Sequence, residues 1–302
     1  MSPEKIAKIA QISSILEVSG YPKPGNVHRT RDFTDMEFED FLISGVVIGD
    51  SVKEVATQVL KINPKIKSNE AFLGKYILKA VEETDKWIAN NTNLGIIMML
   101  IPIAASGAIS GNLTELQENI GLLMENTNVF DAIALYKAIN MTKAGGMGSR
   151  DEFDVTSDKA QKELIVKNQS MYDVLKISAS WDSLASELTS KMKITFNIGF
   201  RRFHDFKKDY STNISTVLTF LTILSNVPDT LISRKYGEDK AKEVSKLAKE
   251  LLDHDNYSDL TFQNKLIEFD DFLFENKLNP GTSADLTAAS IMVSYLNDCY
   301  TE

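Results

Sequence analysis

The sequence contains one cysteine, Cys299, and only three histidines, His28, His204 and His254. A single thiol cannot form an internal disulfide, so this composition suits a reducing environment, and we expect a cytoplasmic protein. One cysteine and three scattered histidines match no familiar spacing of zinc ligands. The composition therefore excludes a disulfide scaffold and gives no indication of a zinc protein.

The sequence also lacks a signal peptide and a long, uninterrupted apolar run. Residues 1–16 place charged side chains among apolar positions at helical spacing, which is not the pattern of a signal peptide. The most apolar stretch, Leu94–Ile109, is interrupted by Pro102, lacks a basic flank and falls short of the ~20 residues of a membrane span. We expect a buried core helix there and no membrane association.

An excess of positive charge is missing as well. The 33 Lys and Arg residues against 42 Asp and Glu residues give a net charge of −9, which argues against general nucleic-acid binding. Any anion site must therefore be a local cluster of cations. Hydrophobic residues make up 43% of the 302 residues, enough for a sizeable core.

Strand patterns are absent, because no stretch of four to eight residues combines apolar alternation with β-branched residues and turn signals. Apolar residues instead recur at helical spacing through most of the chain. We predict an all-α protein, a single compact domain over residues 1–302 with about a dozen helices. The glycine-rich and then acidic segment 143–158 is interpreted as a long loop within this domain, and a lid is one role it could have.

The longest segment that is neither helix nor strand spans residues 17–36. Its two prolines fix the backbone, and Gly25 permits conformations that other residues avoid. Three cations and two carboxylates follow one another there: Lys23, Arg29, Arg31, Asp32 and Asp35. A rigid turn with both signs of charge suits a site for phosphate and metal, although a solvated connection between helices has the same composition.

Three further polar clusters lie at or beside predicted helix starts, in residues 91–95, 228–237 and 279–285. Backbone N–H groups are unpaired at helix starts and the helix dipole favours anions, so phosphates bind readily there. Each cluster also has a purely structural interpretation, as a run of N-caps, a helix end neutralised by Arg234 and Lys235, or a capping box.

The four clusters, in this order, resemble motifs of the triphosphoribosyl-dephospho-CoA synthase family, which makes the prosthetic-group precursor of citrate lyase and malonate decarboxylase. The motifs are Glu-Val, Pro-Lys-Pro-Gly and Asp-Met in residues 17–36, Asn-Thr-x-x-Gly at 91–95, Asp-Thr-Leu at 229–231 and Gly-x-Ser-Ala-Asp-Leu at 281–286. The longer spelling of the last motif, residues 279–289, is most similar to the archaeal-type branch. The resemblance covers the chain from Glu17 to about Leu296.

The sequence departs from the best-known members at three places. Asn93 and Leu94 stand where those members carry a His-Lys pair, and His28 stands where they carry Asp. Residues 31–34 replace a longer Gly-Ala/Ser-His element. These departures predict a retained nucleotide site and leave the acceptor open, as either 3′-dephospho-CoA or a related cofactor precursor.

The resemblance implies that ATP is a substrate and that the 2′-hydroxyl of dephospho-CoA attacks C1′ of its ribose while adenine leaves. A carboxylate would stabilise the oxocarbenium-like transition state and accept the hydroxyl proton. Because the triphosphate is retained, Mg²⁺ held by one or two carboxylates is expected.

The resemblance assigns residues of the four clusters to these roles. Catalysis and Mg²⁺ binding fall to Asp35, Asp229 and Asp285, with Asp32 and His28 as weaker candidates. Contacts to the triphosphate or ribose fall to Lys23, Arg29, Arg31, Asn91, Thr92, Arg234, Lys235 and Ser283.

Two other functions fit the same residues. In a Mg²⁺-dependent, all-α N-glycoside hydrolase, water would replace the acceptor, and adenine would be released from ATP alone. In a nucleotide-binding protein that has lost catalysis, which the absent His-Lys pair favours, ATP would bind without turnover.

Overall fold

The computed structural model describes residues 1–62, 72–88, 93–142, 153–157, 159–254 and 256–301. These residues form the helices α1 to α16 and one π-helical segment, η1, and they contain no strand beyond an isolated bridge between His28 and Arg31. The all-α prediction is therefore confirmed. Asn91, Thr92 and most of the predicted lid lie outside the described residues.

The first eight helices are α1 (Pro3–Ser19), α2 (Phe38–Val47), α3 (Gly49–Val59), α4 (Leu73–Asp85), α5 (Leu94–Ala108), α6 (Leu113–Glu125), α7 (Val129–Thr142) and α8 (Ala160–Lys167). The remaining elements are α9 (Met171–Ser178), α10 (Ser183–Thr189), η1 (Thr195–Phe200), α11 (Arg201–Asp209), α12 (Thr212–Asn226), α13 (Thr230–Tyr236), α14 (Glu238–Leu252), α15 (Leu260–Glu275) and α16 (Gly281–Thr301).

The described helices exceed the predicted dozen in part because one long predicted helix is interrupted. Apolar spacing predicts one helix over 170–188, which is split into α9 and α10 at Asp182, the N-cap of α10. Apolar spacing also predicts a helix from Thr189, but Lys191 and Met192 adopt positive φ angles of 60° and 53°, so the helical segment begins only at η1. Thr34 and Glu37 have the spacing of a capping box, which predicts a helix from near Asp35, but Glu37 is itself the N-cap and Asp40 its partner, so α2 begins at Phe38.

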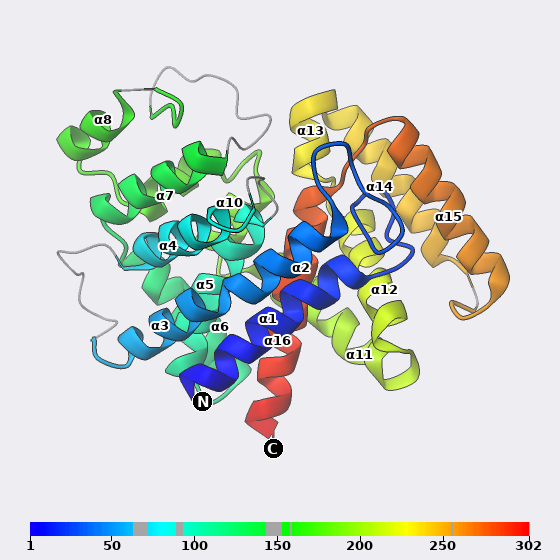
Figure 1. The fold of residues 1–302 in the computed structure, drawn as a ribbon, viewed down its shortest axis with the longest axis horizontal. Coiled ribbons are helices and arrows are strands. Elements are labelled where there is room, and N and C mark those ends of the chain that lie inside the picture. The colour runs from blue at the N-terminus through cyan, green and yellow to red at the C-terminus, as the bar shows by residue number, and fades with distance from the viewer. Residues whose placement is uncertain (63–71, 89–92, 143–152, 158, 255, 302) are drawn as a thin grey trace.

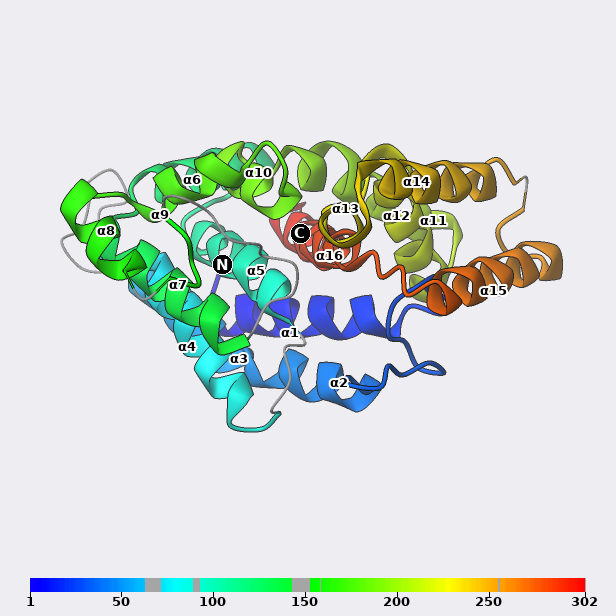
Figure 2. The ribbon, with the colours of Figure 1, turned by 90° about the horizontal axis from the view of Figure 1, so that it is seen from above.

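Helix α16 runs through the middle of the molecule, with α1 beside it (Figures 1 and 2). The larger apolar core gathers the inner faces of α1, α3 to α7, α9 and α16. A smaller core forms among α12, α14 and α15. Side chains of α16 enter both cores, with Met292 in the larger and Ala284 in the smaller one. The central helix therefore joins the two halves of the fold.

Helix α5 is the buried core helix that the sequence predicts, since all of its residues except Gly95 are buried. Among the described residues, no single helix is long and apolar enough to span a membrane. Two bent helix pairs, α5 with α6 and α12 with α13, meet the length and composition criteria only when taken together.

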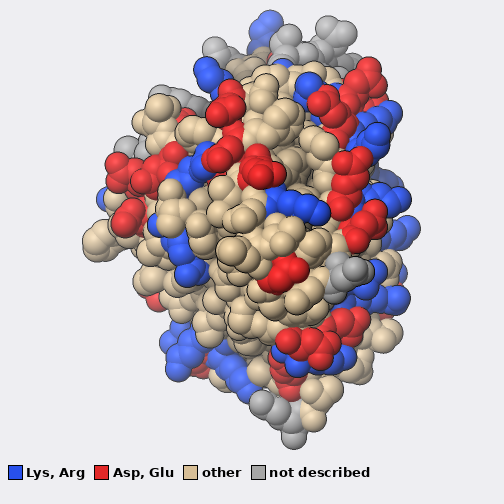
Figure 3. Space-filling model, turned by 90° about the vertical axis from the view of Figure 1, so that its right-hand side faces the viewer, with Lys and Arg blue, Asp and Glu red and all other residues tan. Residues whose placement is uncertain are grey.

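Charged side chains of both signs are interspersed on the face of the molecule that carries α15 (Figure 3). Lys and Arg do not gather there into one broad patch.

The loop between α1 and α2 is anchored to α15 through one buried carboxylate, Asp270. Its Oδ1 accepts a hydrogen bond of 2.8 Å from the Gly25 N–H. Its Oδ2 lies 3.0 Å from His28 Nε2 and 2.9 Å from Arg31 Nε. A charged group buried in this way is stable because every oxygen is paired. These contacts fix the path of the loop, whose Tyr21–Pro22 peptide is cis.

Glycine is required at position 25 for two reasons. Its φ of 73° lies in the left-handed region. A Cβ there would also lie 2.6 Å from the Leu278 carbonyl oxygen and 2.9 Å from atoms of Leu273 and Pro280. The loop therefore packs directly against the segment between α15 and α16, which leaves no space for a side chain at position 25.

We expect Gly25→Ala to lower the free energy of unfolding by about 3 kcal/mol or more, since backbone strain and steric overlap add. Gly237 is a matched control, with φ of 93° and no atom within 4 Å of the position that a Cβ would take. Gly237→Ala should cost only the strain, about 1 kcal/mol. Urea unfolding followed by circular dichroism measures both, and equal losses would contradict the close approach.

Candidate active site

A cavity of about 610 Å³ lies where the loop between α1 and α2 meets the starts of four helices, α5, α10, α13 and α16. Cavities of ~300–1,000 Å³ are typical of sites for small molecules and cofactors. Its charged and amide side chains come from α1, the loop, α13 and the two helix starts at α10 and α16: Glu17, Lys23, Asn26, Asp35, Asp182, Arg234, Lys235, Asn279 and Asp285. Three hydroxyl side chains, Thr142, Ser178 and Thr282, also line it. Its apolar lining comes mainly from α5, α7, α9 and α10.

Asp285, in the second turn of α16, lies against the first turn of α5. A Cβ on Gly95 would lie 2.1 Å from the Asp285 Oδ2 and 2.4 Å from its Cγ. No hydrogen bond joins the Asp285 carboxyl group to another described residue. Burial raises the pKa of Asp285 well above its usual value, and the carboxylates of Glu17, Asp229 and Asp182 raise it further, against the opposing effect of Arg234.

Glu17 and Lys23 form a buried ion pair that lines the cavity. Both residues are 1% exposed. The Lys23 ammonium donates to the Glu17 carboxylate and, at 3.0 Å, to the Glu17 carbonyl oxygen at the end of α1. Burial raises the pKa of Glu17, and the positive charge of Lys23 acts in the opposite direction. The pair therefore holds Lys23 in one orientation.

Asp182 and Arg234 form a second ion pair in the cavity wall. Asp182 Oδ1 accepts hydrogen bonds of 2.9 and 3.0 Å from the N–H groups of Leu184 and Ala185, which caps α10. Its Oδ2 pairs with the Arg234 guanidinium of α13. The Arg234 Nε is buried and has no partner among the described residues. Arg234 and its exposed neighbour Lys235 bring two positive charges to the cavity.

Asp229, which the sequence predicts to be a catalytic or metal-binding residue, is hydrogen-bonded to the starts of two helices. Its Oδ1 accepts hydrogen bonds of 2.9 and 3.2 Å from the Leu231 and Ile232 N–H groups at the start of α13. Its Oδ2 accepts from the Ser283 N–H at 2.8 Å and the Ser283 hydroxyl at 2.9 Å. Both oxygens and the hydroxyl are thus committed to joining the starts of α13 and α16, and neither side chain is part of the cavity lining.

Two predicted phosphate ligands also lie away from the cavity. The Arg29 guanidinium donates to the Ser19 carbonyl oxygen and to Asn213. The Arg31 guanidinium pairs with Asp270 and Asp271 of α15 and lies 4.6 Å from the centre of the Phe274 ring. The weaker candidate His28 is buried against Asp270. The charges of this loop are therefore divided, with Lys23 and Asp35 at the cavity and the others holding the loop in place.

The predicted Mg²⁺ ligands are not gathered into one site. In the described part of the chain, no group of three or more His, Cys, Asp or Glu side chains is arranged to hold a metal ion. Asp35 and Asp285 line the cavity, whereas both oxygens of Asp229 are engaged elsewhere.

Glu17, Asp182 and Gly95 line the cavity but are not among the predicted site residues. Glu17 has a recognisable signal, since a carboxylate in the last turn of a helix opposes the dipole and needs a nearby cation. Gly95 is the glycine of the Asn-Thr-x-x-Gly motif, although the motif does not indicate its contact with Asp285. Asp182 has no such signal, because what matters is its contact with Arg234, which is distant in sequence.

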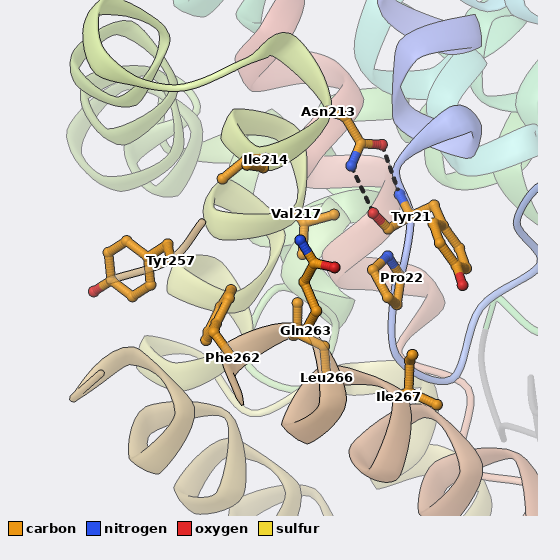
Figure 4. Close-up of a pocket in the computed structure, with 10 residues that line it drawn as sticks. All are labelled: Tyr21, Pro22, Asn213, Ile214, Val217, Tyr257, Phe262, Gln263, Leu266 and Ile267. Carbon is orange, nitrogen blue, oxygen red and sulfur yellow. Dashed lines mark hydrogen bonds between the residues drawn. The ribbon is translucent and has the colours of Figure 1, made fainter. Parts of the chain in front are cut away.

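A second, smaller cavity of about 170 Å³ lies between the loop, α12 and α15 (Figure 4). Uncharged side chains line it, including Tyr257, Phe262 and Gln263. Asn213 exchanges two hydrogen bonds with the Tyr21 backbone, of 3.0 and 2.6 Å, and so ties the loop to α12.

A comparison with known protein families shows which family the chain belongs to. Residues 3–302 match the model of the ATP:dephospho-CoA triphosphoribosyl transferases. The chain belongs to this family. It is therefore a transferase that moves the triphosphoribosyl group of ATP to dephospho-CoA, as the sequence motifs predict.

The fold is similar to a crystal structure of a candidate triphosphoribosyl-dephospho-CoA synthase from Archaeoglobus fulgidus. The TM-score is 0.66 at 22% sequence identity, and the match covers 85% of this chain and 98% of the other. No curated protein matches the chain.

We expect Asp229→Ala to lower the free energy of unfolding by about 2–3 kcal/mol, because it removes a helix cap and leaves buried donors of Ser283 unpaired. Ser283→Ala, which removes one hydroxyl only, should cost about 1 kcal/mol. Urea unfolding measures both variants. A loss in Asp229→Ala no greater than that in Ser283→Ala would contradict the joining role.

We expect Gly95→Ala to reduce turnover by about 100-fold, because the new methyl group must displace the Asp285 carboxyl group. The helix itself should tolerate alanine, which it favours over glycine by about 1 kcal/mol. Adenine release and thermal unfolding measure the two effects separately. Gly111→Ala is the control, since a Cβ there meets only Glu115 Oε2, at 3.5 Å. Full activity of Gly95→Ala would contradict a role of the Asp285 carboxyl group in turnover.

Proposed function

We propose that the 610 Å³ cavity is where the triphosphoribosyl group is transferred. The observation that carries this proposal is the convergence on one cavity of Lys23, Asp35, Arg234, Lys235 and Asp285, from three distant parts of the chain. All of them belong to the polar clusters whose motifs resemble those of the family. The starts of two long helices, α5 and α16, border the same cavity and favour anions.

The triphosphate binds beside Arg234 and Lys235 in this proposal. Arg234 has an unpaired, buried Nε, and Lys235 is exposed without an ion pair within the described residues. Guanidinium and ammonium groups placed together are the usual partners of phosphates. Lys23 supplies a third positive charge, part of which Glu17 neutralises. Leu94, which replaces a family lysine, also lines the cavity, so the cations of α13 are the more important here.

Mg²⁺ binding falls to Asp35 in this proposal, together with the phosphates of ATP. Asp35 lines the cavity, is exposed, and makes no hydrogen bond to another described side chain. One or two carboxylates plus substrate phosphates are the common ligand set for Mg²⁺. The ion would neutralise phosphate charge and orient the triphosphate.

Asp285 lies next to the reacting ribose carbon in this proposal. Its carboxyl group faces the cavity free of the hydrogen bonds that occupy Asp229. The apolar side chains from α7, α9 and α10 offer a surface for an adenine ring.

Incubation with ATP and dephospho-CoA, followed by mass spectrometry, should show free adenine and a triphosphoribosyl adduct of dephospho-CoA. Adenine release without an acceptor would support the hydrolase instead. ATP binding without turnover would support the protein that has lost catalysis.

Arg234→Ala and Lys235→Ala should each raise the KM for ATP about 10-fold or more, since a hydrogen bond to a charged group contributes roughly 1.5–3 kcal/mol. Arg29→Ala should leave this KM unchanged, because its guanidinium bonds to Ser19 and Asn213. Steady-state kinetics at saturating dephospho-CoA measure all three. A KM that rises in Arg29→Ala but not in the α13 variants would contradict the proposed phosphate position.

A further inference from the structure

Burial raises the pKa of two carboxyl groups of the cavity, those of Glu17 and Asp285, but the two groups differ in their partners. Glu17 is paired with the ammonium of Lys23, which stabilises its ionised form. Asp285 has no such pair and no hydrogen bond within the described part of the chain, and its carboxyl group lies against Gly95. The two groups come from α1 and α16, and both line the cavity.

The charged groups that affect Asp285 belong to three other helices, α1, α10 and α13, or to their N-caps. Glu17 faces it from α1, Asp182 from the start of α10 and Asp229 from the start of α13, and Arg234 is the opposing cation. Burial is the largest cause of the raised pKa of Asp285, and three negative neighbours against one cation raise it further. When two carboxyl groups of one site differ in this way, one commonly serves as the acid and the other as the base.

The transfer needs one acid and one base. The C1′–N9 bond of ATP breaks with its electron pair moving to adenine, which must gain a proton to leave as a neutral base. The C1′–O bond forms from the hydroxyl of dephospho-CoA, which must lose a proton.

We propose that Asp285 donates the proton to the departing adenine and that Glu17, held by Lys23, accepts the proton of the attacking hydroxyl. The inference rests on the function proposed above. After one turnover Asp285 is ionised and Glu17 protonated, and transfer of that proton from Glu17 to Asp285 restores both. The hydroxyl proton thus ends on adenine, and no further reactant is consumed. Glu17 is a catalytic residue in this scheme, and Lys23 positions it.

7-Methyl-ATP separates the two roles, because its base already carries a positive charge and leaves as neutral 7-methyladenine without gaining a proton. Asp285→Asn should lose about 10²–10⁴-fold in turnover with ATP, the range typical of general acid catalysis. With 7-methyl-ATP the same variant should approach the wild-type rate. This recovery would also show that the variant is folded.

Glu17→Gln should lose turnover to a similar extent with both donors, because the hydroxyl must still be deprotonated. Azide, a nucleophile that carries no proton, should restore base release in this variant and form a triphosphoribosyl azide. The amide oxygen of Gln can still accept from Lys23, and the charge of Lys23 is no longer neutralised, so the affinity for ATP should not fall. If Glu17→Gln does not fold, Glu17→Asp replaces it in the experiment, because it keeps a carboxylate. We then expect Glu17→Asp to be more active than a Lys23→Met variant.

Asp239→Asn, at an exposed carboxylate of α14, is the control for loss of negative charge and should retain wild-type rates. Equal losses of Asp285→Asn with both donors would overturn the acid role. Undiminished turnover in Glu17→Gln, or no recovery with azide, would overturn the base role. Failure of the wild-type protein to release adenine from ATP and dephospho-CoA would instead overturn the proposed function itself.

Discussion

Both oxygens of Asp229 are bonded to the first turns of two helices, and the cavity depends on this interaction. The carboxylate accepts two hydrogen bonds from the start of α13 and two from Ser283 in α16. Arg234 lies on one of these helices and Asp285 on the other. Because the helix starts are joined at a buried point, the guanidinium and the carboxyl group hold fixed positions relative to each other. Burial raises the pKa of the Asp229 carboxyl group, and the hydrogen bonds from Ser283, Ile232 and Leu231 act in the opposite direction.

A buried carboxylate also fixes the loop between α1 and α2, part of which is bound to α15 while another part lines the cavity. Asp270 of α15 binds the Gly25 N–H, His28 and Arg31, and these contacts leave Lys23 and Asp35 facing the cavity. The positive φ of Gly25 and its contact with Leu278 make the turn tight enough for this division. Some charged residues of this loop therefore hold it in place, and others line the cavity.

Some carboxyl groups of the cavity have a cationic partner and one does not, and this difference determines which of them can hold a proton. Glu17 and Asp182 each have a cationic partner, Lys23 and Arg234. Asp285 has none of its own, and its carboxyl group lies against Gly95. A site with paired and unpaired carboxyl groups can hold a proton at one position and take one up at another, as a displacement at a glycosidic carbon requires.

The sequence by itself determined the helical class, the buried character of α5, the family and the motifs that reach the cavity. Those features depend on local periodicity, on composition and on short runs of residues that stay together in any fold. The tertiary structure decided which charged residues face the cavity. Lys23 and Arg31 lie in the same loop with the same sign of charge, yet Glu17 holds one at the cavity and Asp270 holds the other away from it. Asp229 and Asp285 are both aspartates at helix starts, yet only one has free oxygens. The partner that a charged side chain finds depends on contacts between residues far apart in the chain, and no local pattern contains that information.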